Sequence, residues 1–433
     1  MNTAPTCLFC LILYAIPLHA ESVSGKPTHP YPGGAGAEIW VLAGQSNMQG
    51  VGPVPSGWAF EPDPLIKMFN LDNSWMPAGL PLHRYFEAVA PAYRRHLQRT
   101  PEEWAQLSEK SRKGKIGYRY VGFGLFFAEH LRKHLDQPIG LIPCALGGTS
   151  IAQWDPALKD KGGESFYGAM FERIQMVGKI RGVMWYQGEN ESLEPSNARI
   201  YEQNLLRLVD SLRRDTGIED LPFICVQLAP FASHDGLRSQ IDYEKEGMDQ
   251  AGGFDTVREA QRLAATKRQN MFLTSAIDLR LSDLGHIDFE SQQRLGRRLA
   301  EVVLTKVYDR NGHGSPIELK SVELFKRNPP AVEQALRVYL NGVTGKIVSK
   351  GKPTGFLLRS LPGQPAPPSI YRVELEGDGP EAACILRLNR PMTEPVLLHY
   401  GSGLVPYVNI TDELDIPVPA FGPIRIEPLE KSG

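Results

Sequence analysis

Cysteine is scarce in this sequence, which has five cysteines in 433 residues. Two of them, Cys7 and Cys10, lie in an apolar stretch at the N-terminus, and only Cys144, Cys225 and Cys384 remain beyond it. A small, odd number of cysteines does not form the framework of a disulfide-stapled fold. No group of cysteines and histidines has the spacing typical of a zinc site, so a structural metal is not indicated. We therefore expect neither a disulfide framework nor a structural metal.

The sequence also lacks an excess of charge of either sign, because 47 basic side chains balance 49 acidic ones and leave a net charge of −2. Proteins that bind nucleic acids or acidic membranes carry basic patches or runs of like charge. The densest basic stretch, residues 110–119, mixes lysine and arginine with glycine and is typical of a solvated loop. A nucleic-acid partner is therefore not expected.

Long apolar runs are absent except near the N-terminus, where an apolar segment extends from Cys7 to Leu18. This segment is shorter than the ~20 residues that a membrane-spanning helix needs. It precedes Ala20, a small residue that suits signal peptidase, and it predicts a signal peptide over residues 1–20. We expect the mature protein to be secreted or periplasmic and to have no membrane segment.

What the sequence does contain is an alternation of short apolar runs and amphipathic segments. Continuous apolar runs predict buried strands at residues 38–43, 139–144, 182–186, 223–228 and 271–276. Helical spacing of apolar residues lies between and after them, over residues 124–135, 197–214, 256–267 and 289–307. This alternation predicts an α/β domain with a three-layer, flavodoxin-like fold and a five-stranded parallel sheet, which binds ligands at the carboxyl ends of its strands.

The pattern changes near residue 312, and this change divides the chain into two predicted domains. Short strands separated by glycine and proline turns are expected at residues 336–340, 354–359, 371–375, 383–388 and 396–400. They predict a smaller, sandwich-like all-β domain over residues 312–433. The α/β domain then covers residues 38–311, after a Pro/Gly-rich leader at residues 21–37. A polar, helix-tending insertion at residues 84–117 is expected to form a lid or rim.

A glycine–serine motif, Gly44-Gln-Ser-Asn-Met48, follows the first predicted strand directly. This position exposes the Ser46 hydroxyl at the carboxyl end of the strand, where backbone N–H groups can face an oxyanion. On its own, such a motif more often marks a turn or a helix N-cap than a catalytic serine. The Gly-x-Ser-x-Gly elbow of the α/β-hydrolases occurs nowhere in the sequence, so Ser46 does not belong to a nucleophile elbow of that fold.

Two further polar motifs follow the second and third predicted strands. The first, Ala145-Leu-Gly-Gly-Thr-Ser150, has paired glycines that permit close backbone approach and leave N–H groups free. Alone it would indicate a tight turn, and it lacks the spacing of a phosphate-binding loop. The second, Trp185-Tyr-Gln-Gly-Glu-Asn-Glu191, offers the Gln187 amide as an oxyanion donor. Its Glu189 can orient a histidine or bind a substrate hydroxyl, and a solvated acidic turn is the plainer alternative.

The fourth motif, Ser282-Asp-Leu-Gly-His286, precedes the last helix predicted in the α/β domain. The Asp283 carboxylate can reach Nδ1 of His286 while Nε2 points away, which fixes the tautomer of a histidine that accepts a serine proton. Isolated residues of this kind are more often surface groups or helix caps. Four such motifs at the ends of different strands together supply a nucleophile, a base, a carboxylate and oxyanion donors, so we predict an acyl-transfer site.

Four motifs resemble the sequence blocks of the SGNH-hydrolase superfamily: Gly44-Gln-Ser-Asn-Met48, Gly147-Gly-Thr-Ser-Ile151 with Trp154, Trp185-Tyr-Gln-Gly-Glu189 and Asp283-x-x-His286. They are most similar to its sialate O-acetylesterase and acetylxylan esterase branch, carbohydrate esterase family six. Residues 81–83, 121–128 and parts of 398–421 also resemble that branch. The resemblance implies a secreted serine esterase that removes O-acetyl groups from carbohydrates and needs no cofactor.

The resemblance also implies a role for each motif. Ser46 is the expected nucleophile and His286 the general base, and the oxyanion donors are the Ser46 N–H, the Gly148 N–H and the Gln187 side chain. The superfamily usually has asparagine at the position of Gln187. The third member of the triad stays open between Asp283, which its short spacing from His286 favours, and Glu189. The residues expected to bind the substrate are Gln45, Asn47, Thr149, Trp154 and Tyr186.

Three other functions fit the sequence less well than an O-acetylesterase does. A non-catalytic carbohydrate-binding protein on this fold would have a broken triad, yet every catalytic position here is filled. A lipase-like or thioesterase-like enzyme would need a wide apolar acyl channel, whereas the aromatic and polar side chains of the motifs suit sugar binding. A glycosidase that used Glu189 and Asp283 would leave Ser46 unexplained. An acetylated carbohydrate is therefore the expected substrate.

Overall fold

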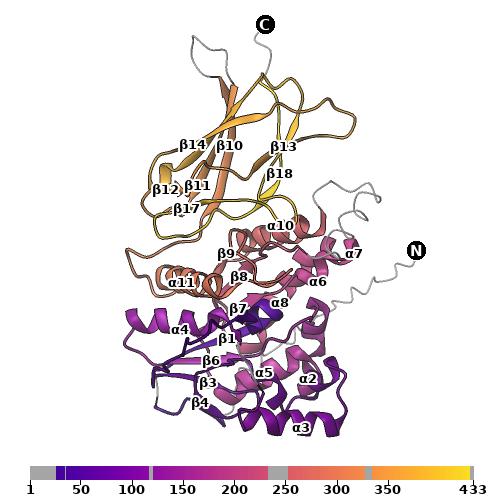
Figure 1. The fold of residues 1–433 in the computed structure, drawn as a ribbon, viewed down its shortest axis with the longest axis vertical. Helices are drawn as coiled ribbons and strands as arrows, with labels where there is room; N and C mark the ends of the chain where they lie inside the picture. The colour runs from indigo at the N-terminus through magenta and orange to yellow at the C-terminus, as the bar shows by residue number, and fades with distance from the viewer. Residues whose placement is uncertain (1–25, 35, 117–119, 233–251, 327–333, 430–433) are drawn as a thin grey trace, which may run out of the picture.

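The computed structural model describes residues 26–34, 36–116, 120–232, 252–326 and 334–429. It contains a mixed α/β unit followed by a β-rich unit (Figure 1). The predicted signal peptide, residues 1–20, lies outside the described residues, as does part of the predicted leader. Among the described helices, none combines the length and the apolar character that crossing a bilayer requires.

Seven strands form the main sheet, in the order β4-β3-β6-β1-β7-β8-β9. Neighbouring strands run parallel, except that β4 pairs antiparallel with β3 at one edge. The bounds of the strands are β1 Glu38–Gly44, β3 Ile66–Phe69, β4 Trp75–Pro77, β6 Ile139–Pro143, β7 Gly182–Tyr186, β8 Phe223–Gln227 and β9 Met271–Ser275.

All five predicted strands of this sheet are present, as β1, β6, β7, β8 and β9, in the second-first-third-fourth-fifth order of flavodoxin-like sheets. The expectation of only five strands is wrong, because β3 and β4 extend the sheet beyond β6. These two strands are four and three residues long. The sequence of β3, Ile-Lys-Met-Phe, is too short to show the continuous apolar pattern of a buried strand.

Helices cover both faces of the main sheet. Helix α4 (Phe123–His134) packs against α11 (Phe289–Lys306). Right-handed crossovers place α5 (Phe166–Val177), α8 (Tyr201–Thr216) and α10 (Gly252–Lys267) on the opposite face. The predicted helix over residues 197–214 is two helices, because Ile200 leaves the helical conformation between α7 (Pro195–Arg199) and α8.

Short elements surround the carboxyl ends of the central strands. The described part of the predicted insertion at residues 84–117 contains three helical segments, η1 (Tyr85–Glu87), α2 (Pro91–His96) and α3 (Pro101–Arg112). The remaining short elements are α1 Ser46–Gln49, β2 Gly52–Pro53, β5 Tyr120–Val121, η2 Ile151–Trp154, η3 Pro156–Glu164 and α6 Glu189–Ser192.

The β-rich unit has a core of its own, between a sheet of order β10-β11-β15-β14 and a sheet of order β13-β16-β18. The five predicted strands are present there, as β11, β13, β14, β15 and β16, and β12 pairs with β17. The bounds are β10 Glu318–Lys326, β11 Gln334–Asn341, β12 Ile347–Ser349, β13 Phe356–Ser360, β14 Ile370–Glu376, η4 Gly379–Glu381, β15 Ala383–Leu388, β16 Val396–Tyr400, β17 Ile410–Asp412 and β18 Phe421–Ile426.

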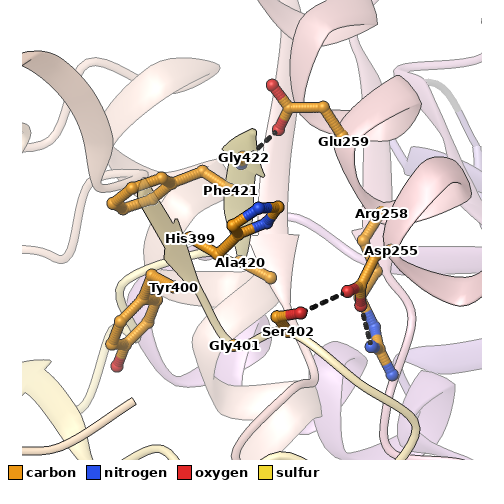
Figure 2. A pocket seen from close by; sticks show the side chains of 10 residues that line it. All are labelled: Asp255, Arg258, Glu259, His399, Tyr400, Gly401, Ser402, Ala420, Phe421 and Gly422. Carbon is orange, nitrogen blue, oxygen red and sulfur yellow. Dashed lines mark hydrogen bonds and ion pairs between the residues drawn. The ribbon is translucent and has the colours of Figure 1, made fainter. Parts of the chain in front are cut away.

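Buried polar contacts join the β-rich unit to α10 (Figure 2). The Asp255 carboxylate accepts a hydrogen bond from the Ser402 hydroxyl at 2.6 Å and from the Gly403 N–H. The buried Arg258 guanidinium donates to Asp255 and to the Gly403 carbonyl. The cavity at this junction has a volume of about 10 Å³, which is room for at most one water molecule. The junction is therefore a packed interface between the units and not a substrate site.

Candidate active site

The hydroxyl of Ser46 and the imidazole of His286 meet at the carboxyl edge of the main sheet. Ser46 begins α1 directly after β1, and His286 lies in the loop before α11. Although the two residues are 240 positions apart in sequence, Ser46 Oγ lies 3.0 Å from His286 Nε2. Both side chains are partly exposed. A proton can therefore pass from this hydroxyl to the imidazole while a substrate approaches from solvent.

Asp283 holds the other side of the imidazole. Its Oδ2 lies 2.8 Å from His286 Nδ1, and its Oδ1 accepts the backbone N–H groups of Gly285 and His286, both at 2.8 Å. Burial raises the pKa of Asp283, but these hydrogen bonds and the His286 ring outweigh burial and leave the pKa below its usual value. The carboxylate therefore stays ionised, which fixes the tautomer that leaves Nε2 facing the serine.

Glu189 is buried, and Asn47 lies between it and the loop that carries His286. Its Oε1 accepts the Asn47 amide at 2.8 Å, and its Oε2 is buried without a hydrogen-bond partner in the described part of the chain. Burial raises the pKa of Glu189, although the Asn47 hydrogen bond and the charge of His286 act in the opposite direction. Of the two carboxylates that the sequence left open, it is Asp283 that contacts the imidazole.

The paired glycines after β6 pass close to the serine. A Cβ at Gly147 would lie 3.3 Å from the Ser46 Cβ, and Gly148 has a φ of +74°. The Gly147 N–H donates to Gln49 Oε1 at 2.8 Å, and the Gly147 carbonyl accepts from His96 Nε2 at 3.0 Å. That carbonyl and the Gly148 N–H belong to one trans peptide group and point in opposite directions. The hydrogen bond from His96 to the Gly147 carbonyl therefore makes the Gly148 N–H point away from His96.

The N–H groups of Ser46 and Gly148 have no acceptor among the residues that the structure describes. Two unpaired donors at a helix start and a glycine turn are the arrangement that holds a developing oxyanion. The predicted Ser46 and Gly148 donors are therefore available, close to the hydroxyl. The Gln49 and His96 side chains fix the backbone that carries one of them.

Gln187, the third predicted oxyanion donor, points elsewhere. The residue is fully buried, and its Nε2 donates to Glu191, to the Thr149 carbonyl at 3.2 Å and to Gln45 Oε1 at 3.3 Å. Reversing the amide would set its oxygen against the acceptor oxygens of Glu191 and Thr149. The amide hydrogens of Gln187 therefore bind the protein in this structure, and its assignment to the oxyanion hole stays a prediction.

The five predicted substrate-binding side chains also lie below the surface. Each is at most 3% exposed, so none offers a face to a sugar. Packing and internal hydrogen bonds engage their side chains in this structure, and the prediction that they contact the substrate stays untested. The residues are Gln45, Asn47, Thr149, Trp154 and Tyr186.

Asn47 and Trp154 show what such buried residues do. Asn47 Nδ2 donates to the Gly285 carbonyl at 3.0 Å, and Asn47 Oδ1 accepts the Ile287 N–H at 3.2 Å, so the side chain ties the histidine loop to α1. The Trp154 indole stacks on Phe166 and donates to the Thr149 hydroxyl at 3.1 Å. Both residues position the site from below rather than forming its surface.

Three residues that the sequence did not single out support the site: Gln49, His96 and Glu191. Gln49 and His96 act on the backbone of the glycine turn, and His96 comes from α2 in the 84–117 insertion. Such contacts leave no local pattern in a sequence. Glu191 lies four residues after Gln187, and it accepts both the Gln187 amide and the Ile151 N–H. The four-residue spacing within one motif is the signal that could have linked these two side chains.

Replacing Glu191 by leucine is expected to destabilise the fold. The Ile151 N–H would be left buried without an acceptor, and the Gln187 amide would keep only its longer hydrogen bonds to Thr149 and Gln45. The loss is expected to cost about 1–3 kcal/mol in the free energy of unfolding. Denaturant unfolding of Glu191→Leu and of Glu194→Leu, a control at an exposed position nearby, measures the effect. Equal unfolding midpoints for the two variants would show that the Glu191 contacts do not contribute to the free energy of unfolding.

Comparison with known proteins places the chain among the carbohydrate esterases. It belongs to the family described as "Carbohydrate esterase, sialic acid-specific acetylesterase", whose family model matches residues 36–305. A probable carbohydrate esterase of Arabidopsis thaliana is 30% identical over 290 residues, which are 62% of this chain and 90% of that protein. The predicted resemblance to sialate acetylesterases is thereby confirmed, and membership of carbohydrate esterase family six stays a prediction.

The fold has a solved counterpart. The crystal structure of XAC1771, a carbohydrate acetylesterase from Xanthomonas citri, is similar with a TM-score of 0.64 at 19% sequence identity. The similarity covers 90% of this chain and 80% of that one. At this level of identity the likeness concerns the fold alone, and its extent shows that it includes the β-rich unit.

Proposed function

We propose that this protein is a serine O-acetylesterase that hydrolyses acetyl esters on carbohydrates, with Ser46 as the nucleophile. The observation that carries the proposal is the 3.0 Å distance between Ser46 Oγ and His286 Nε2, with Asp283 at Nδ1 of the same ring. A hydroxyl, an imidazole and a carboxylate in this order activate the hydroxyl for attack on an acyl carbon. Membership of a carbohydrate esterase family supports the ester as the bond attacked.

The reaction proceeds in two steps. Ser46 Oγ attacks the acetyl carbonyl carbon while His286 Nε2 takes the hydroxyl proton, and the Ser46 and Gly148 N–H groups hold the negative oxygen. The intermediate collapses, the bond to the sugar oxygen breaks, and His286 returns the proton to that oxygen. A water molecule, deprotonated by His286, then attacks the carbonyl carbon of the acetyl group on Ser46. The bond between that carbon and Ser46 Oγ breaks, acetate leaves, and His286 returns the proton to Oγ. Asp283 stabilises the imidazolium in both steps.

Acetate release from a panel of esters tests the proposed function. The panel contains O-acetylated sialosides, acetylated xylo-oligosaccharides, p-nitrophenyl acetate and p-nitrophenyl palmitate. We expect hydrolysis of acetylated sugars and of the small acetate, and little hydrolysis of the palmitate. The sialic acid named in the family description makes O-acetylated sialosides the first candidates. A preference for the palmitate would favour a lipase-like enzyme, and no hydrolysis of any ester would favour a non-catalytic carbohydrate-binding protein.

Secretion is a separate proposal. The apolar segment that ends before Ala20 supports export with removal of residues 1–20. Mass spectrometry of the N-terminal peptide of the protein collected outside the expressing cells identifies the first residue. Recovery of an intact Met1 from the exported protein would contradict a cleaved signal peptide.

Paired amide substitutions separate the roles of the two acids. Asp283→Asn is expected to lower kcat/KM for p-nitrophenyl acetate by about 10⁴-fold, the scale of losing the carboxylate of a serine-protease triad. Glu189→Gln should cause a smaller loss, because Glu189 makes no hydrogen bond to the imidazole. Circular dichroism of both variants checks that they are folded. A greater loss in the Glu189 variant would assign the triad carboxylate to Glu189.

A further inference from the structure

A second group of ionisable side chains lies away from Ser46, where α4, α11 and the segment leading to β10 come together. His130 and His134 are one helical turn apart on α4, Glu301 is on α11, and His313 is in the segment that follows α11. Helices α4 and α11 lie side by side in the lower left of Figure 1. None of these four residues takes part in the proposed esterase chemistry.

Three imidazoles surround the Glu301 carboxylate. His130 Nε2 lies 2.7 Å from Glu301 Oε1, and His313 Nδ1 lies 2.9 Å from Glu301 Oε2. The centroid of the His134 ring lies 5.0 Å from that of His130 and 4.7 Å from that of His313. Single donor atoms of His130, His134 and Glu301 all lie within 4.8 Å of one another.

Hydrogen bonding alone accounts for only part of this arrangement. The Glu301 carboxylate is already satisfied by His130, by His313 and by the Gly314 N–H. His134 makes no hydrogen bond within the described part of the chain, and its ring packs against the rings of His130 and His313. A third imidazole beside a satisfied carboxylate has no role in an ion pair, whereas three imidazoles and one carboxylate are ligands that zinc prefers.

We propose that His130, His134, Glu301 and His313 bind one divalent transition-metal ion, with zinc as the favoured ion. In a tetrahedral zinc site with bonds of about 2.0–2.1 Å, donor atoms are spaced roughly 3.3 Å apart. Donor atoms of His130, His134 and Glu301 already lie within 4.8 Å of one another, and His313 lies 2.9 Å from Glu301, so binding an ion would require side-chain rotations that draw the four donors together. His130 and His134, four residues apart on a helix, present both rings to one side, as helical zinc ligands do. Four protein ligands make the site structural rather than catalytic.

The site has a route to solvent and a structural consequence. His134 is exposed, and His313 also lines a cavity of about 460 Å³ beside the β-rich unit, so the cluster is open to solvent. A bound ion would link α4 and α11 to the segment that leads into β10. A metal was not expected from the sequence, and the four-residue spacing of His130 and His134 was overlooked there. Glu301 lies 171 positions from His130, so no local motif contains both.

Zinc binding by the full chain tests the proposal. The protein is purified without a polyhistidine tag, stripped with EDTA, dialysed and titrated with zinc chloride in a calorimeter, and its metal content is measured by mass spectrometry. We expect one zinc per chain at this site and a higher unfolding temperature with zinc, because an ion that binds only the folded state stabilises it. Magnesium, which prefers oxygen ligands, should not replace zinc.

Variants locate the ion. His134→Ala changes an exposed side chain and should abolish stoichiometric zinc binding and the thermal shift while the fold and the esterase activity persist. His29→Ala, at an exposed position outside the cluster, should retain both. His286→Ala controls for zinc held at the proposed active site. Absence of stoichiometric binding in the wild type, or its persistence in His134→Ala, would overturn the proposal, as would a loss confined to His286→Ala.

Discussion

Replacing Ser46 by alanine is expected to reduce kcat/KM for p-nitrophenyl acetate by on the order of 10⁶-fold, the loss that follows removal of the nucleophile from a serine-protease triad. The reason is that Ser46 Oγ is the group 3.0 Å from His286 Nε2 and the atom on which the acetyl group would be carried. The alanine side chain leaves the backbone N–H groups in place, so the fold and the substrate site should persist.

A serine on the surface provides the matched control for this variant. Ser56 lies in an exposed turn, and Ser56→Ala should retain wild-type activity. Substantial turnover by a folded Ser46→Ala enzyme would remove Ser46 from the mechanism and leave the reaction to another nucleophile or to an activated water molecule.

The His286→Ala variant is expected to lose activity to the same extent, on the order of 10⁶-fold in kcat/KM, because the serine then has no base. Members of a triad act as one unit, so their effects do not add. The double variant Ser46→Ala/His286→Ala should therefore be no slower than either single variant.

Steady-state kinetics on the three variants, with His29→Ala as an exposed control, measures this coupling. If the double variant were slower by the product of the two single effects, the two side chains would act independently. The 3.0 Å contact between them would then make no contribution to catalysis.

The architecture was predictable where the sequence pattern was long and continuous. Strand β7, Gly-Val-Met-Trp-Tyr, is buried at every position, and helix α11 repeats its apolar residues over five turns. Both elements can therefore be predicted from their local sequence pattern. Strands β3 and β4 are short, and pairing with neighbours distant in sequence determines them. Such pairing depends on tertiary contacts that a single sequence does not show.

The meeting of Ser46, Asp283 and His286 was predictable from the sequence, and most of the contacts that surround them were not. Ser46, Asp283 and His286 carry a pattern because the chemistry requires these residue types at strand ends. Gln187 and Trp154 look equally suited to chemistry in the sequence, but both are fully buried, and the sequence does not reveal to which side of a loop a polar side chain turns. His96 was missed because it acts through the Gly147 carbonyl, and backbone contacts place few demands on residue type.

Covalent labelling tests the central claim most directly. The active wild-type protein is treated with a fluorophosphonate, which reacts with activated serine hydroxyls, and is then digested and mapped by mass spectrometry. The proposed mechanism predicts a single label on Ser46, loss of activity in proportion to labelling, and no label on His286→Ala, whose serine lacks its base. A label on a different residue, or full activity after Ser46 is labelled, would contradict it.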